Sequence, residues 1–178
     1  MVYGRMDNVV LIGFMGCGKT SLGMKLANAY GFQFLDTDAY IEEKEGIKIN
    51  DIFCQKGETY FRDLEYRCLE EIRNTVHHCV ISTGGGMPLC ERNVKLLQSI
   101  GSVIFLKTSK ETTYVRLKGD TKRPLLQCDN PEQRIEELLR IRVPIYEKAA
   151  NYIIDTDQKS FYALIEEISK SILMKSEE

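Results

Sequence analysis

The sequence predicts an α/β fold of three layers, α/β/α, in which helices cover both faces of a five-stranded parallel sheet. Short apolar runs alternate with longer segments of helical periodicity along the 178 residues. The apolar runs are nearly continuous, which is typical of strands buried on both faces. Right-handed crossovers would bring the carboxyl ends of the strands to one edge, where such folds bind ligands.

The first half of the chain predicts three strands and four helical segments. Strands are expected at 8–12, 32–35 and 79–82, and helical segments at 19–30, 39–45, 50–57 and 58–75. Gly31 can end the first helix, because glycine adopts the left-handed conformation that often follows a helix.

The second half continues the alternation. Helices are expected at 91–99 and 110–118, strands at 102–106 and 152–154, and a polar, basic loop at 119–129. Asn130 is a suitable cap for a further helix, with Pro131 in its first turn and Gln133 at the third position. The last helix carries one apolar stripe: Phe161, Leu164, Ile165, Ile168 and Ile172.

Composition limits the classes of protein. The length predicts one domain over 1–178, and 24 basic against 26 acidic residues argue against a broad nucleic-acid surface. Neither a secretory signal nor an apolar run long enough for a membrane span is visible. The six cysteines form no C-x-x-C pair, so we expect buried free thiols in a reducing cytoplasm. We expect no nucleic-acid or membrane partner.

The first predicted strand leads directly into Gly13-Phe14-Met15-Gly16-Cys17-Gly18-Lys19-Thr20, the phosphate loop. It matches G-x-x-x-x-G-K-[ST], whose backbone N–H groups and helix N-terminus surround phosphate oxygens. Lys19 would reach the β- and γ-phosphates of ATP, and Thr20 would ligate Mg²⁺. The alternative is a plain glycine turn, but a chance match has a probability on the order of 0.01.

Cys17 occupies a variable position of the phosphate loop. A helix N-terminus and Lys19 would make its thiol more reactive, which predicts inactivation by alkylating reagents and protection by ATP. The simpler alternative, which we favour, is a small residue that fits the loop.

Two acids, Asp36 and Asp38, follow the second predicted strand. Residues two apart in an extended chain point to one side, so both would face the phosphate loop. One could hold Mg²⁺ through water and the other accept the proton of an attacking alcohol. The alternative is a helix cap, which explains one aspartate better than two. No acid follows the third strand, so a bound Mg²⁺ would depend on this pair.

Gly84-Gly85-Gly86 follows the third predicted strand and would let a ligand press against main chain, or simply form a tight turn. Three arginines could bind anions. Arg62, beside aromatic residues and Glu65, suits a carboxylate or phosphate, Arg123 lies in the basic loop, and Arg142 lies near the end of a long helix. Each also has a plain interpretation as a surface ion pair, a solvated loop or a helix-dipole partner.

These motifs together resemble shikimate kinases, a family of nucleoside-monophosphate-kinase-like P-loop enzymes. The resemblance covers nearly the whole chain from Asn8. Its markers are the phosphate loop, Asp36-Thr37-Asp38, Gly57-Glu58 with Phe61-Arg62 and Glu65, Gly84–Gly86, Arg123-Pro124-Leu125-Leu126, and Arg142 with Pro144 and Tyr146. It implies transfer of the ATP γ-phosphoryl group to the 3-hydroxyl of shikimate, on the route to chorismate and aromatic amino acids.

The resemblance also implies roles for individual residues. Asp38 would bind the shikimate hydroxyls and either act as base or orient the attacking hydroxyl, with Lys19 and Arg123 as the other catalytic residues. Asp36 would hold Mg²⁺ through water beside Thr20. The remaining assignments are ATP contacts at Gly16, Cys17, Gly18, Ser21, Arg116 (against adenine) and Arg123; shikimate contacts at Arg62, Gly84, Gly85, Gly86 and Arg142; and ring packing at Phe53 and Phe61.

The resemblance places a substrate-binding region at about 37–65 and a lid at about 117–130. We expect a monomer that uses ATP, shikimate and Mg²⁺. The nearest rivals are a gluconate or nucleotide kinase, and a nucleotide-binding regulatory protein without catalysis. An intact set of Lys19, Asp36, Asp38 and Arg123 argues against the latter.

Overall fold

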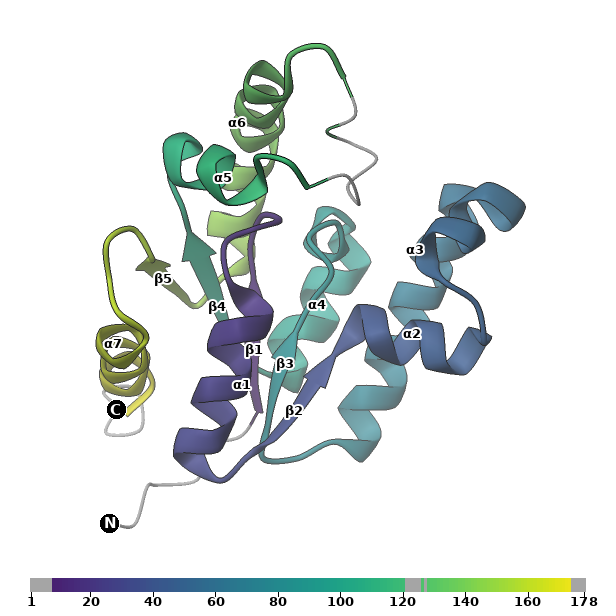
Figure 1. Ribbon diagram of the computed structural model, residues 1–178. Coiled ribbons are helices and arrows are strands. Elements are labelled where there is room, and N and C mark those ends of the chain that lie inside the picture. The colour runs from purple at the N-terminus through teal and green to yellow at the C-terminus, as the bar shows by residue number, and fades with distance from the viewer. Residues whose placement is uncertain (1–7, 121–125, 127, 174–178) are drawn as a thin grey trace.

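The computed structural model describes residues 8–120, 126 and 128–173. Five parallel strands form one sheet in the order β2-β3-β1-β4-β5, which confirms the predicted fold class (Figure 1). The strands are β1 Asn8–Ile12, β2 Gln33–Asp36, β3 Cys79–Ser82, β4 Gly101–Lys107 and β5 Tyr152–Asp155.

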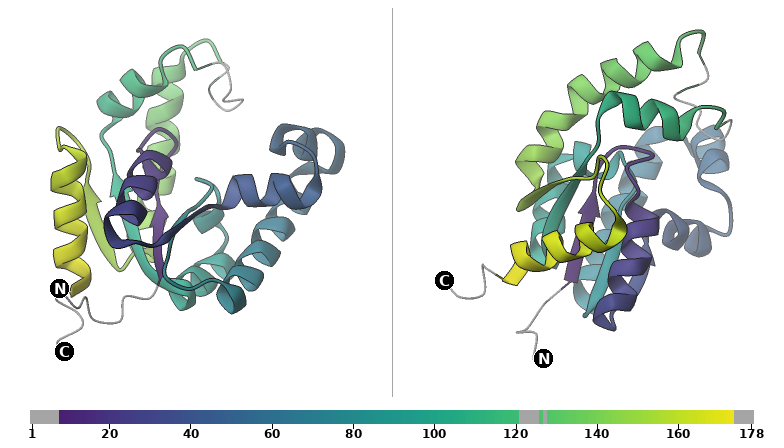
Figure 2. Two further views of the ribbon diagram at one scale, coloured as in Figure 1. Left: turned by 60° about the horizontal axis from the view of Figure 1, so that its bottom comes forward. Right: turned by 60° about the vertical axis from the view of Figure 1, so that its left-hand side comes forward.

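Helices cover both faces of the sheet (Figures 1 and 2). They are α1 Lys19–Tyr30, α2 Thr37–Glu45, α3 Ile49–Thr75, α4 Glu91–Ile100, α5 Lys110–Leu117, α6 Pro131–Ala149 and α7 Phe161–Leu173, with a short 3₁₀ helix at Met87–Leu89. One buried cluster joins the sheet to α3, α4 and α6, and a second joins it to α1 and α7. None of these described helices combines the length and apolar character needed to cross a membrane.

Several predicted boundaries are wrong by a few residues, for local reasons. Phe32 belongs to the turn after α1, because its N–H donates to the carbonyl of Ala27, and β2 therefore begins one residue later. The two helical segments expected at 50–57 and 58–75 form one kinked element, α3. Gly57, at φ +82°, makes the kink, in a region that L-residues avoid.

The helices α2 and α3 project at one side of the carboxyl-end edge, and α5 and α6 stand at the other (Figure 1). The phosphate loop lies between these two groups. The predicted lid at about 117–130 is only partly described, because residues 121–125 and 127 lie outside the described residues.

Candidate active site

The phosphate loop joins β1 to α1 and takes its shape from glycine. Gly16 and Gly18 have φ values of +78° and +100°, and Gly18 is the residue that precedes the first turn of α1. Lys19 Nζ donates hydrogen bonds to the carbonyls of Gly13 at 2.8 Å and Phe14 at 3.0 Å. The ammonium group is therefore held inside its own loop, beside the N-terminal amides of α1, which together favour an anion.

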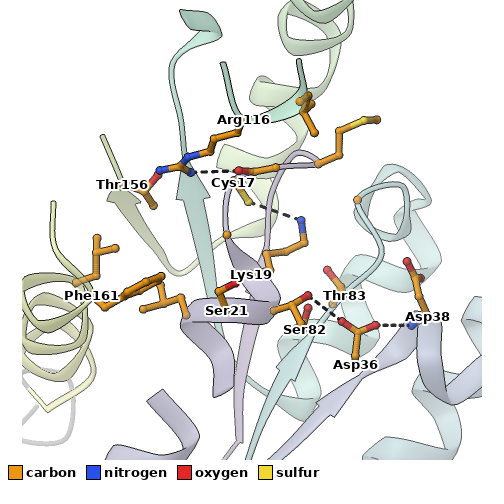
Figure 3. A pocket seen from close by; sticks show the side chains of 18 of the residues that line it. Cys17, Lys19, Ser21, Asp36, Asp38, Ser82, Thr83, Arg116, Thr156 and Phe161 are labelled. Atoms are coloured by element: carbon orange, nitrogen blue, oxygen red, sulfur yellow. Dashed lines mark hydrogen bonds between the residues drawn. The ribbon is translucent and has the colours of Figure 1, made fainter. Parts of the chain in front are cut away.

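A pocket of about 810 Å³ opens at this loop. Figure 3 shows the acids of β2 and α2 on one side, and Arg116, Thr156 and Phe161 on the other. Its lining includes Met15–Leu22, Asp36, Asp38, Ser82, Thr83, Gly85, Arg116, Leu117, Asp120, Thr156, Lys159, Ser160, Phe161 and Leu164. The pocket is thus at the carboxyl ends of β1, β2 and β3, the place the topology favours for a ligand.

Asp36 connects β2 to the phosphate loop. Its Oδ2 accepts a hydrogen bond from Thr20 Oγ1 at 3.2 Å, and its Oδ1 caps α2 by accepting from the N–H groups of Asp38 and Ala39. The capping interpretation is therefore correct for Asp36. The strand-alternation argument for Asp38 is wrong, because the chain is helical from Thr37, yet both carboxylates line the pocket.

The glycine triplet lies against the two side chains expected to hold the acceptor. A Cβ atom on Gly84 would lie 2.5 Å from Asp38 Oδ1, and one on Gly86 would lie 2.6 Å from Arg62 Nη1. The Gly84 N–H also donates to Thr37 Oγ1 at 3.0 Å. The absence of side chains at 84 and 86 therefore lets Asp38 and Arg62 approach the same stretch of backbone.

Two carboxylates orient Arg62. Glu65 accepts from Nη1 at 2.8 Å, and Glu58 accepts from Nη2 at 3.0 Å. The Glu65 side chain is 1% exposed, whereas that of Glu58 is 69% exposed. Burial raises the pKa of Glu65 to about 7, and the positive charge of Arg62 opposes this increase. Phe61 packs against Phe53 with ring centroids 4.7 Å apart, and the Arg62 guanidinium lies over the Phe61 ring.

Arg142 approaches the phosphate loop from α6. Its guanidinium carbon lies 5.6 Å from the centroid of the Phe14 ring. The helix-dipole interpretation of Arg142 is wrong, because α6 continues through Pro144 to Ala149 and the dipole acts within the last turn. Neither Arg62 nor Arg142 lines the 810 Å³ pocket. Arg62 instead lies against the glycine triplet, and Arg142 lies against Phe14 of the phosphate loop.

The nucleotide side holds Arg116, whose Nη1 donates to the carbonyl of Gly16 at 3.1 Å. Cys17 is 3% exposed. This burial favours the interpretation of Cys17 as a small residue that fits the loop, and not the interpretation as a reactive thiol. All six cysteines are free, as expected, but the expectation that they are buried is wrong for Cys54 and Cys128, which are exposed. Arg123 lies outside the described residues.

Sequence reasoning missed several pocket residues. Ser82, Thr83, Lys159 and Phe161 line the pocket but carry no motif.

The phosphate loop with Lys19, together with Asp36 at the end of β2 and Asp38 at the start of α2, places this chain in the class of P-loop kinases. The sequence model of the family described as Shikimate kinase matches residues 15–173. Shikimate kinases from Thermodesulfovibrio yellowstonii and Persephonella marina are 46% and 45% identical to it, over 93% and 92% of this chain and 94% and 97% of theirs.

Solved structures agree with the sequence relatives. Shikimate kinase from Acinetobacter baumannii in complex with shikimate has a TM-score of 0.89 and 40% identity, over 96% of this chain and 94% of its own. A gluconokinase from Sinorhizobium meliloti has a TM-score of 0.58 and 19% identity, and so shares the fold alone. The chain belongs to the shikimate kinase family, and its reaction is the ATP-dependent phosphorylation of shikimate.

Proposed function

We propose that Asp38, Arg62, Arg142 and the backbone of Gly84–Gly86 form the shikimate site, with the 3-hydroxyl directed at the γ-phosphate of ATP in the phosphate loop. The observation that carries this proposal is the convergence of Asp38 and Arg62 on one glycine triplet beside that loop. Shikimate has one carboxylate and several hydroxyls, which match a forked cation, a carboxylate and exposed amides.

In the proposed reaction, Asp38 accepts the proton of the attacking hydroxyl or orients it. Lys19 and the N-terminal amides of α1 stabilise the charge on the transferred group. Arg62 and Arg142 bind the carboxylate of the acceptor, which does not react. Arg123 would close over the phosphates, and Arg116 would contact adenine.

Thr20 and Asp36 fit a hard cation, because a hydroxyl and a carboxylate oxygen lie 3.2 Å apart beside the phosphate loop. Among the described residues no group of three or more His, Cys, Asp and Glu is suited to a metal. A Mg²⁺ ion here would thus depend on Thr20, Asp36 through water, and the phosphates, and it would supply charge neutralisation.

An assay of ADP release with shikimate, gluconate and nucleoside monophosphates as acceptors tests the proposed site. We expect turnover that depends on shikimate and requires Mg²⁺. Gluconate is also a hydroxy carboxylate but has no ring, so equal turnover with gluconate would reject the proposal that this site is built for shikimate. Nucleotide binding without any turnover would favour a regulatory protein. A monomeric state and a cytoplasmic location also belong to this proposal, and light scattering of the purified chain tests the first.

A further inference from the structure

Tyr146 has no role in the proposed chemistry, yet it is fully buried. It lies on α6, one helical turn after Arg142, and its ring packs against Phe105 of β4 with centroids 5.2 Å apart. Its hydroxyl donates a 2.6 Å hydrogen bond to the carbonyl of Gly85. Most buried polar groups have a hydrogen-bond partner, and here the partner is the middle residue of the glycine triplet.

Gly85 also lies against the phosphate loop. A Cβ atom on Gly85 would lie 3.4 Å from the carbonyl oxygen of Gly13, 3.7 Å from the amide nitrogen of Met15 and 3.9 Å from the Tyr146 hydroxyl. The Gly85 backbone is therefore packed close to both the Tyr146 hydroxyl and the loop that binds ATP. Movement of Gly85 would change the spacing between the triplet and the phosphate loop.

Arg142 lies one helical turn before Tyr146 on α6. Burial raises the pKa of Tyr146 to about 12, and the charge of Arg142 opposes this increase. The hydroxyl thus keeps its proton at neutral pH and remains a donor to Gly85. The hydroxyl therefore joins α6, which carries the expected carboxylate ligand Arg142, to the glycine triplet and, through Gly85, to the phosphate loop.

We propose that Tyr146 is a positioning residue, whose hydroxyl holds the Gly85 backbone so that the acceptor pocket stays aligned with the phosphate loop. This inference rests on the proposed shikimate site at Gly84–Gly86. The phosphate loop has its own hydrogen bonds from Lys19, so loss of the hydroxyl should affect the acceptor and not the nucleotide.

Tyr146→Phe tests the role of the hydroxyl in steady-state kinetics and nucleotide titrations. We expect the KM for shikimate to rise about 10-fold, the usual scale for one buried hydrogen bond, while the Kd for ADP stays within about twofold. Tyr152→Phe is the matched control, because the buried Tyr152 hydroxyl on β5 has no hydrogen-bond partner among the described residues. It should leave both constants unchanged.

An unchanged KM for shikimate in Tyr146→Phe would overturn the proposal. A parallel increase in the Kd for ADP, or loss of the fold, would overturn it as well, because either result would give the hydroxyl a general structural role. Incorporation of p-aminophenylalanine at 146 restores a donor at the same position and should recover most of the affinity. Gly86→Ala separates the two proposals. If it raises the KM for shikimate and Tyr146→Phe does not, only the role of Tyr146 fails; if neither does, the shikimate site itself is misplaced.

Discussion

Glu65 accepts a 2.8 Å hydrogen bond from the Arg62 guanidinium while its own side chain is 1% exposed. The carboxyl group is therefore withdrawn from water and balanced by one partly exposed cation. Since burial raises the pKa of Glu65 to about 7, the group binds a proton on folding at pH values between about 4.5 and 7. Its contribution to stability is fully present below pH 4.5 and is lost as the pH rises through 7.

Glu65→Gln should consequently change the pH dependence of the free energy of unfolding. Relative to the variant, the wild type should lose at most about 3 kcal/mol between pH 4.5 and 8. Denaturant titrations of both proteins at several pH values measure this difference. Glu58→Gln removes the exposed carboxylate on the same guanidinium and is the matched control. Parallel profiles for wild type and Glu65→Gln would contradict the assignment.

Gly84→Ala and Gly86→Ala form a pair with different expected effects. Gly86 has helical backbone angles, so alanine adds a methyl group there without backbone strain, at a place 2.6 Å from Arg62 Nη1. It should displace the guanidinium and raise the KM for shikimate about 10-fold. Gly84→Ala should displace the Asp38 carboxylate and chiefly lower kcat. The same kinetic change in both variants would argue against separate roles.

Asp38→Asn should lower kcat by about 100-fold or more, because the amide cannot accept the hydroxyl proton. The change conserves size, so the Kd for ADP is the internal control and should stay the same. Single-turnover measurements at saturating ATP and shikimate report the step directly. A kcat like that of the wild type would remove Asp38 from the chemistry.

Asp36→Asn separates the metal role of Asp36 from its capping role. Asparagine caps helices about as well as aspartate, so the unfolding free energy should change by less than about 0.5 kcal/mol. The Mg²⁺ concentration for half-maximal activity should nevertheless rise several-fold, because a carboxylate is lost beside Thr20. Asp36→Ala, which removes the cap as well, should also cost about 1 kcal/mol. An unchanged Mg²⁺ requirement in both variants would leave Asp36 as a cap only.

The glycine triplet shows what sequence reasoning could not reach. Its position after β3 predicted close approach by a ligand, which stays a prediction. The structure adds that Asp38 and Arg62 themselves occupy the space of the missing side chains at 84 and 86. Arg142 shows the opposite case. Its position invited a helix-dipole interpretation, which fails because α6 extends beyond Pro144.

The sequence by itself determined the parallel α/β class, the phosphate loop and most strands and helices, because these depend on local patterns of apolar residues, glycine and caps. Only the tertiary structure decided that Tyr146 holds Gly85, 61 positions away, and that Glu65 is buried beneath Arg62. The Tyr146–Gly85 contact joins residues far apart in the chain, and no local pattern encodes it. Arg62 and Glu65 are only three residues apart, so their proximity was visible in the sequence, but the burial of Glu65 follows from the packing of α3 against the sheet.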